Sequence, residues 1–271
     1  MKTNLIWLLA TITFREGTRS NVLYGIVLLS GLLFISNLFI TQLFAFDLGK
    51  VAIDVGFSIL SLAGLSIIFF YGIALLSKDI HQRNICMVIC HPIARWKYVI
   101  GKFFGLALFL LAAIGILALF TALSLWAGTQ TGGLGVPRDF SWGMLFLAVS
   151  FNLLSLLVVM SIGFFFTVLT TSLYLSMLLT FFTYLIGNTL DTIVKVLVKG
   201  EFVAAGDLFI KFMKLLTWIF PNLSVFDLKP NLGYGLPQST PYLAWITGYG
   251  LTYTCLVLIA TTIILHYKDI K

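Results

Sequence analysis

The sequence predicts an all-α polytopic membrane protein, and its composition, its long apolar runs and the placement of its charges all support that fold class. Of its 271 residues, 60% are hydrophobic and only 10% are charged, whereas about a quarter of the residues in soluble domains are charged. A bilayer accommodates such a composition, because its hydrocarbon core, about 30 Å thick, needs about 20 apolar residues per crossing helix. We therefore expect a single transmembrane domain over residues 1–271.

Six stretches are long and apolar enough to be read as crossings. The shortest is the fifth, so a misjudged crossing there would move the carboxyl terminus to the other side of the membrane. We predict six transmembrane helices over residues 22–46, 51–77, 99–127, 141–169, 172–190 and 242–266.

Basic residues are concentrated in alternate connections between these stretches. If the amino terminus lies in the cytoplasm, the connections on that side carry the whole formal net charge of +7, and those on the other side balance acids against bases. The positive-inside rule then places both termini in the cytoplasm. Membrane orientation explains the positive charge, so we predict no nucleic-acid partner.

Residues 3–20 have the pattern of an amphipathic helix. Thr11, Arg15 and Arg19 recur at helical spacing, opposite an apolar face. We expect an interfacial helix whose Arg15, Glu16 and Arg19 face the cytoplasmic lipid head groups, because charges at mid-membrane would cost several kcal/mol. The other interpretation is a simple extension of the first span.

The connection between the fifth and sixth spans, residues 191–241, is long enough to hold structure of its own. From Asp207 onward, charged and apolar residues alternate at helical spacing until Pro221 and Asn222 end the pattern. This run is too short to cross the bilayer, so we predict outer re-entrant or interfacial helices.

Four residues near this outer face are candidates for a translocation path or outer gate: Asn188, Asp191, Pro221 and Asn222. Asn188 and Asp191 lie about one helical turn apart at the outer end of the fifth span. Polar groups inside membrane spans often mark transport pathways. Capping of the helix at the membrane interface is the other interpretation.

The connection between the second and third spans, residues 78–98, is polar and basic and has the features of a docking element. It contains an apolar strip suited to a groove on a soluble partner, a proline that stops the helix, and basic residues placed for acidic or phosphate contacts. The other interpretation is a solvated loop at the membrane surface. The residues assigned to docking are Asp79, Arg83, Ile85, Val88, Ile89, Pro92, Arg95 and Lys97.

The order of features in this connection resembles the coupling-helix region of type-2 ABC transporter permeases. An acidic residue, a short helix and Pro92-x-x-Arg95 precede Gly101-Lys102 at the start of a span. Further similar motifs belong to the branch that includes the permease of nitrous oxide reductase maturation. They are Phe14-Arg15-Glu16, Leu23-Tyr24, Phe220-Pro221-Asn222-Leu223 and Phe226-Asp227-Leu228.

The resemblance implies the transmembrane subunit of an exporter in the cytoplasmic membrane of a bacterium or archaeon. It implies a homodimer, or a pair with a homologous permease, in which each coupling helix docks on a separate ATPase subunit that holds ATP and Mg²⁺. No G-x-x-x-x-G-K-[ST] motif occurs in the chain. We therefore expect no catalytic residue and no cofactor here; the expected partners are the ATPase, the lipid bilayer and an outer or periplasmic protein.

Two other functions compete with transport. A non-transporting membrane anchor or force-transmitting component shares every feature named so far. An intramembrane enzyme is less well supported, because His81, His91 and His266 all lie at the inner edge and no two carboxylates fall within the spans.

Two local patterns have a functional and a structural interpretation. Cys86 and Cys90, with His91 nearby, are soft ligands that zinc or copper would accept, but their spacing matches no common zinc pattern, and we predict no metal site. Gly101 and Gly105 form a G-x-x-x-G motif that either packs two helices closely or reflects the frequency of glycine in membrane helices.

Overall fold

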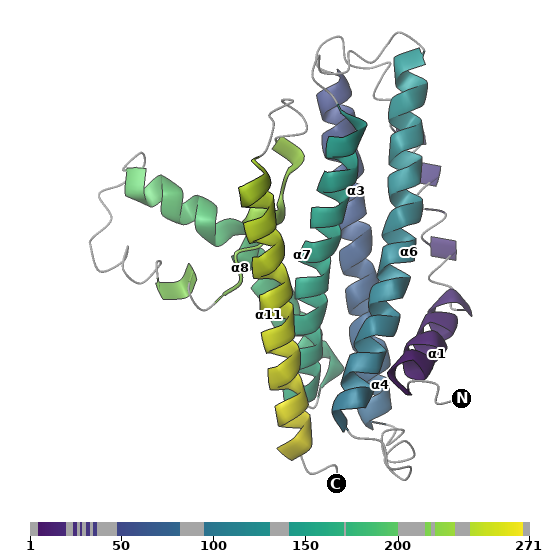
Figure 1. Ribbon diagram of the computed structural model, residues 1–271, viewed down its shortest axis with the longest axis vertical. Helices are drawn as coiled ribbons and strands as arrows, with labels where there is room; N and C mark the ends of the chain where they lie inside the picture. Colours follow the sequence, from purple (N-terminus) through teal and green to yellow (C-terminus); the bar gives the residue numbers. More distant parts are fainter. Residues whose placement is uncertain are drawn as a thin grey trace.

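The computed structural model describes a bundle of long helices (Figure 1). The described residues are 5–19, 24–25, 28, 31–32, 35–36, 48–81, 95–130, 141–170, 172–199, 215–217, 220–230 and 239–267. They contain no β-strand. The elements are α1 (Leu5–Arg19), α3 (Leu48–Ile67), the π-helix η1 (Ile68–Ile73), α4 (Ala74–His81), α6 (Arg95–Gln130), α7 (Trp142–Leu169), α8 (Leu173–Lys199), the 3₁₀ helix η2 (Ser224–Phe226) and α11 (Thr240–Tyr267).

Five helices in the described residues are long and apolar enough to cross a membrane. They correspond to the second to sixth predicted spans and cover Ile53–Ile80, Arg95–Trp126, Trp142–Leu169, Leu173–Asp191 and Thr240–Tyr267. The prediction of an all-α polytopic membrane protein is thus confirmed for the part of the chain described. The predicted first span, 22–46, lies mostly outside the described residues, so the sixth crossing stays a prediction.

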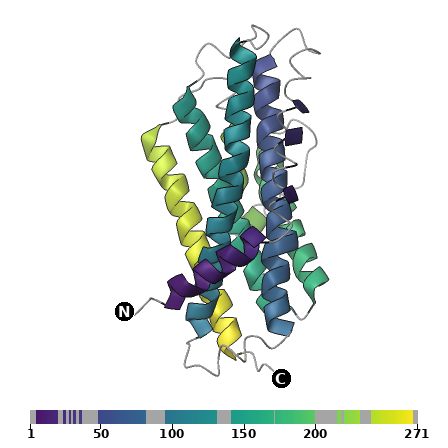
Figure 2. The same cartoon turned by 90° about the vertical axis from the view of Figure 1, so that its right-hand side faces the viewer.

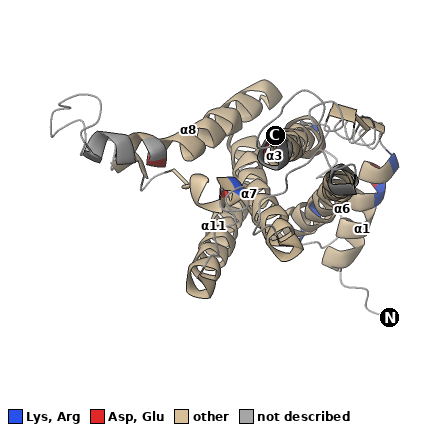
Figure 3. Cartoon of the chain, turned by 90° about the horizontal axis from the view of Figure 1, so that it is seen from above, with Lys and Arg blue, Asp and Glu red and all other residues tan. Residues whose placement is uncertain are grey.

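The helix that contains the fifth predicted span continues beyond that span. The span covers Leu173–Asp191, close to the predicted 172–190, whereas α8 continues to Lys199. Seen from above, α8 runs away from the other helices toward its carboxyl end (Figure 3). Much of its apolar surface is exposed, with Tyr174 at 81% and Phe182 at 50%. In a membrane this surface meets lipid or another protein, because hydrocarbon solvates apolar side chains well.

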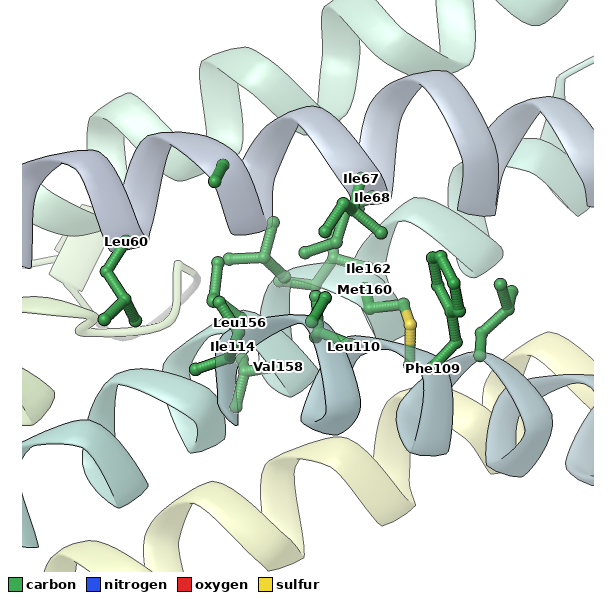
Figure 4. Packing of buried hydrophobic residues seen from close by; sticks show 14 of the residues in the cluster. Leu60, Ile67, Ile68, Phe109, Leu110, Ile114, Leu156, Val158, Met160 and Ile162 are labelled. Carbon is green, nitrogen blue, oxygen red and sulfur yellow. The ribbon is translucent and has the colours of Figure 1, made fainter. Parts of the chain in front are cut away.

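The core lies where α3, α6 and α7 meet. Leu60 and Ile68 from α3 and η1 face Ile114 of α6 and Leu156 of α7 (Figure 4). Gly64 lets the helices approach closely, because a Cβ there would lie 2.3 Å from Leu156 Cδ1. Lipid tails are as apolar as leucine, so close packing of this kind, more than burial from water, holds membrane helices together.

The short helix α1 crosses obliquely over the first half of α6 (Figure 2). We call this end of the bundle inner and the opposite end outer, after the orientation that the sequence predicts. α1 packs against Gly101 and Gly105 of α6. A Cβ at Gly101 would lie 2.8 Å from Leu9 Cβ, and one at Gly105 would lie 2.6 Å from the carbonyl oxygen of Ala10. One turn further along, Gly17 of α1 lies against the Phe109 ring. The G-x-x-x-G motif therefore packs two helices, and its partner is α1 of the same chain.

Replacement of Gly105 by alanine should weaken the packing of α1 against α6. The new methyl group would overlap the Ala10 backbone, and overpacking of this kind costs about 1–3 kcal/mol. A matched control is Gly115→Ala on the same helix, where nothing lies within 4 Å of the new Cβ. Thermal unfolding of the purified protein in detergent should show a lower midpoint for Gly105→Ala only. Equal midpoints for the two variants would contradict the close packing of α1.

Candidate functional site

A buried charge cluster lies at the inner end of the bundle, where α4 and α6 meet. Lys102 Nζ is 2.7 Å from Asp79 Oδ2, and the Tyr98 hydroxyl donates a hydrogen bond of 2.6 Å to the same oxygen. The side chains of Lys102 and Asp79 are only 9% and 14% exposed. Charges withdrawn from water this far are stable only when paired and hydrogen-bonded, so the cluster fixes α4 against α6.

The same lysine reaches α1. Lys102 Nζ lies 3.9 Å from Glu16 Oε2, whose side chain is 52% exposed. An ion pair at this distance and exposure contributes little to stability. Tyr71, in the π-helix η1, adds a second link by donating a 3.4 Å hydrogen bond to the carbonyl oxygen of Thr13. Two separate elements, α6 and η1, therefore hold α1 at this end of the bundle.

Arg95, the first residue of α6, links the carboxyl end of α11 to the start of α6, close to the Lys102 cluster. Its Nη1 donates hydrogen bonds of 2.8 and 2.9 Å to the carbonyl oxygens of Leu265 and His266. These carbonyls belong to the last turn of α11, where backbone oxygens lack helical partners and a positive charge is favourable. Arg95 therefore caps α11.

Only three of the predicted docking residues are described. Asp79 and Arg95 contact other helices of the same chain, which the sequence did not predict, and Lys97 Nζ lies 5.5 Å from the centre of the Trp96 ring. The others lie outside the described residues, namely Arg83, Ile85, Val88, Ile89 and Pro92. Lys102 was missed as a site residue; a lysine one turn inside a span, next to a glycine, was the available signal.

The predicted interfacial residues lie together on the exposed side of α1. Arg15, Glu16 and Arg19 line a shallow hollow with Ile12. Ile12 is 52% exposed and Trp7, on the same helix, is 66% exposed. The outward side of α1 therefore combines charged and apolar groups, the combination found on helices at a membrane surface.

A pocket of about 60 Å³, lined by both apolar and polar side chains, lies between α3, α7, α8 and residues 223–229. In it, Asn152 of α7 donates a 3.0 Å hydrogen bond to the Ser61 hydroxyl of α3. The side-chain amide of Asn188 in α8 donates a 3.1 Å hydrogen bond to the Tyr184 carbonyl oxygen. The lining side chains with hydrogen-bonding groups are Ser61, Asn152, Ser155, Tyr184, Asn188, Asp227 and Lys229.

Residues 220–230 cover this pocket by packing back against the bundle, in yellow-green beside α11 in Figure 1. The Leu223 N–H donates to the Gly187 carbonyl oxygen at 3.0 Å, and the Asn222 N–H donates to the Tyr249 hydroxyl at 2.9 Å. Only glycine fits at position 187, because a Cβ would lie 2.6 Å from the Pro221 carbonyl oxygen. Leu223 is 1% exposed, so this segment is part of the core.

The four residues predicted for a translocation path or outer gate lie close together around this segment. Asn188 lines the pocket, and Asp191 accepts a 3.3 Å hydrogen bond from the Ser224 hydroxyl. That hydroxyl also lies 2.8 Å from Asn222 Oδ1. Pro221 contacts α8 at Gly187, as described above. Sequence reasoning missed Ser61, Asn152 and Ser155, because hydroxyl and amide side chains in apolar helices give no distinctive spacing.

Aromatic rings brace the covering segment against α11. The Phe226 ring stacks on Tyr249 with 6.0 Å between ring centres, and Tyr249 stacks on Trp245 at 5.8 Å. Gly250 leaves the space for this contact, since a Cβ there would lie 3.0 Å from Phe226. The stack holds residues 220–230 in place from the side opposite α8.

The described residues contain no group of three or more histidine, cysteine, aspartate or glutamate side chains placed to hold a metal ion. Cys86, Cys90 and His91 lie outside the described residues, so the zinc or copper hypothesis stays a hypothesis. The chemistry that the described sites offer is ion pairing at the inner end and hydrogen bonding in the pocket.

Comparison with protein-family models and with curated proteins finds no match for this chain.

Removal of the buried lysine should destabilise the bundle. In Lys102→Met, Asp79 keeps a buried charge without its partner, which costs about 3–5 kcal/mol. The double variant Lys102→Met/Asp79→Leu removes both charges and should recover most of that loss. Glu16→Gln is the control and should change stability by less than about 1 kcal/mol. Chemical denaturation in detergent measures the four proteins; a double variant no more stable than Lys102→Met would contradict the paired burial.

Proposed function

We propose that this chain is the transmembrane permease subunit of an ATP-driven, exporter-like ABC transporter. It would pair with a separate ATPase subunit, which holds ATP and Mg²⁺, and convert nucleotide binding and hydrolysis into movement of a substrate or an outer partner. The motifs between residues 78 and 102 and the polytopic helical fold support this proposal.

One observation carries the proposal furthest: both flanks of the predicted docking loop are fastened to the bundle. On one side Asp79 is held by Lys102 and Tyr98, and on the other Arg95 caps α11. A force applied to residues 82–94 therefore acts on α4, α6 and α11 together. A solvated surface loop needs no such fastening.

The proposed assembly has six spans with both termini in the cytoplasm of a bacterium or archaeon. α1 packs at the inner end of α6, whereas α3 begins at the outer end, where Gly56 faces Thr121 of α6. This arrangement supports a crossing by residues 22–46. The exposed apolar side of α8 is suited to a second copy or a homologous permease.

The small size of the pocket favours a second candidate. A pocket of about 60 Å³ is far below the roughly 300–1,000 Å³ of sites that enclose drug-sized ligands. A force-transmitting component that moves an outer partner needs no larger cavity. We keep this function as the alternative.

Association with an ATPase tests both candidates against a simple anchor. Affinity-tagged protein from its native membrane should co-purify with an ATPase subunit. Val88→Glu and Ile89→Glu should abolish co-purification, because a charge in the apolar strip opposes docking in a groove. Leu134→Glu, the same change in the connection predicted on the outer side, is the matched control.

The proposal fails if no ATPase co-purifies with the unchanged protein. It also fails if the loop variants retain the ATPase as well as Leu134→Glu does. Asp79 and Arg95 are unsuitable for this test, since their replacement would disturb the chain's own helices.

A further inference from the structure

We propose that the pocket beneath residues 220–230 is an aqueous vestibule that takes up small, uncharged, hydrogen-bonding solutes, water among them. The inference rests on the lining groups, their depth, the charges at the rim and the volume. It deepens the proposed function by naming a substrate class, and that step alone depends on the proposed function.

The interior of the pocket is neutral and offers both donors and acceptors. Asn152 and Asn188 contribute amides and Ser61 and Ser155 contribute hydroxyls. Ser61 already donates to the Phe57 carbonyl oxygen at 2.9 Å and accepts from Asn152, and it can accept one further hydrogen bond. Ser155 makes no side-chain hydrogen bond within the described residues. A polar solute that both donates and accepts fits this inventory better than an ion of either sign.

These groups are partly buried and lie well along the helices from their ends. Asn152 is ten residues from the first residue of α7, about 15 Å along the axis at 1.5 Å per residue. Polar groups at such depth carry a desolvation cost unless they find partners. Most hydroxyls of these helices avoid it by donating to a carbonyl oxygen four residues earlier, as Thr167 does to Gly163 at 2.6 Å. The Asn152 and Ser155 side chains do not donate to a carbonyl oxygen of the preceding turn. Water in the pocket supplies their remaining hydrogen bonds.

One acidic and one basic residue line the pocket nearest solvent. Asp227 is exposed and Lys229 is partly exposed, and Asp227 Oδ1 accepts a 3.2 Å hydrogen bond from the Lys229 N–H. This hydrogen bond comes from the Lys229 backbone, so it does not fix the position of the ammonium group. The rim still carries one charge of each sign and therefore has no net charge that would attract anions or cations. Charged solutes would also lose hydration on entering a neutral interior.

The volume sets an upper limit on the occupant. A cavity of about 60 Å³ holds several water molecules or a solute of a few heavy atoms, since about 10–15 Å³ of such volume is enough for one water. A lipid or a drug-sized molecule does not fit this conformation. The vestibule therefore admits water-sized or slightly larger solutes while residues 220–230 remain packed.

Cysteine alkylation in nanodiscs tests this proposal without any ATPase. The three native cysteines, Cys86, Cys90 and Cys255, are first replaced by serine. Ser155→Cys and Ala148→Cys each place a thiol in the pocket. Ser150→Cys, nearer the outer end of the same helix but exposed on its outside, is the matched control for lipid. Ser239→Cys, exposed before α11, is the control for water.

The probe is iodoacetamide, a small neutral amide, and its rate is compared with that of the charged analogue iodoacetate. Only a hydrated thiolate reacts readily, so both pocket thiols should react with iodoacetamide at least about tenfold faster than Ser150→Cys. The ratio of iodoacetamide to iodoacetate rates should be higher in the pocket than at Ser239→Cys. The proposal is overturned if both pocket thiols react no faster than Ser150→Cys while Ser239→Cys reacts. A higher iodoacetate rate in the pocket would overturn the uncharged class. Neither result depends on whether an ATPase binds, so the proposed function stands or falls separately.

Discussion

The ion pair between Lys102 and Asp79 is the interaction on which the inner half of this structure depends. A lysine one turn inside a membrane span is stable only with an opposite charge beside it, and Asp79 supplies that charge at 2.7 Å. The pair fixes the register of α4 against α6. Gly101 and Gly105 lie on either side of Lys102 in the sequence, and α1 packs against them. The same turns of α6 therefore form the ion pair with α4 and the close backbone contact with α1.

Continuous helices connect this inner cluster to the outer pocket. α3, η1 and α4 carry Ser61 of the pocket and Asp79 of the cluster on one helical rod, about 27 Å apart at 1.5 Å per residue. The π-helix lies between them and presents Tyr71 to α1. π-helical turns are frequent at functional sites in helices. A displacement of the loop after α4 would thus shift the continuous helix α3–η1–α4. It would move the pocket residue Ser61 directly and would move α1 through its contact with Tyr71.

The sequence predicted the parts of the fold that follow from apolar length. Five spans lie where runs of hydrophobic residues predicted them, and the amphipathic pattern of residues 3–20 corresponds to α1 over Leu5–Arg19. It did not predict the partners of single polar residues, because these depend on which helices are neighbours. Asp79 and Arg95 were assigned to a soluble partner, yet they bond to α6 and α11. Asn188, Asp191, Pro221 and Asn222 were grouped by their position near the outer face, whereas Ser61 and Asn152 come from distant parts of the chain.

The central claim is that movement at the docking loop is transmitted through the Lys102 cluster to the outer face. The most direct measurement is the distance between spin labels at Trp142 and Ser239, at the outer ends of α7 and α11, in complex with the ATPase subunit. The account predicts that a non-hydrolysable ATP analogue shifts this distance in the otherwise unchanged protein and not in Lys102→Met/Asp79→Leu, which lacks both charges. A shift of full size in the double variant would contradict it.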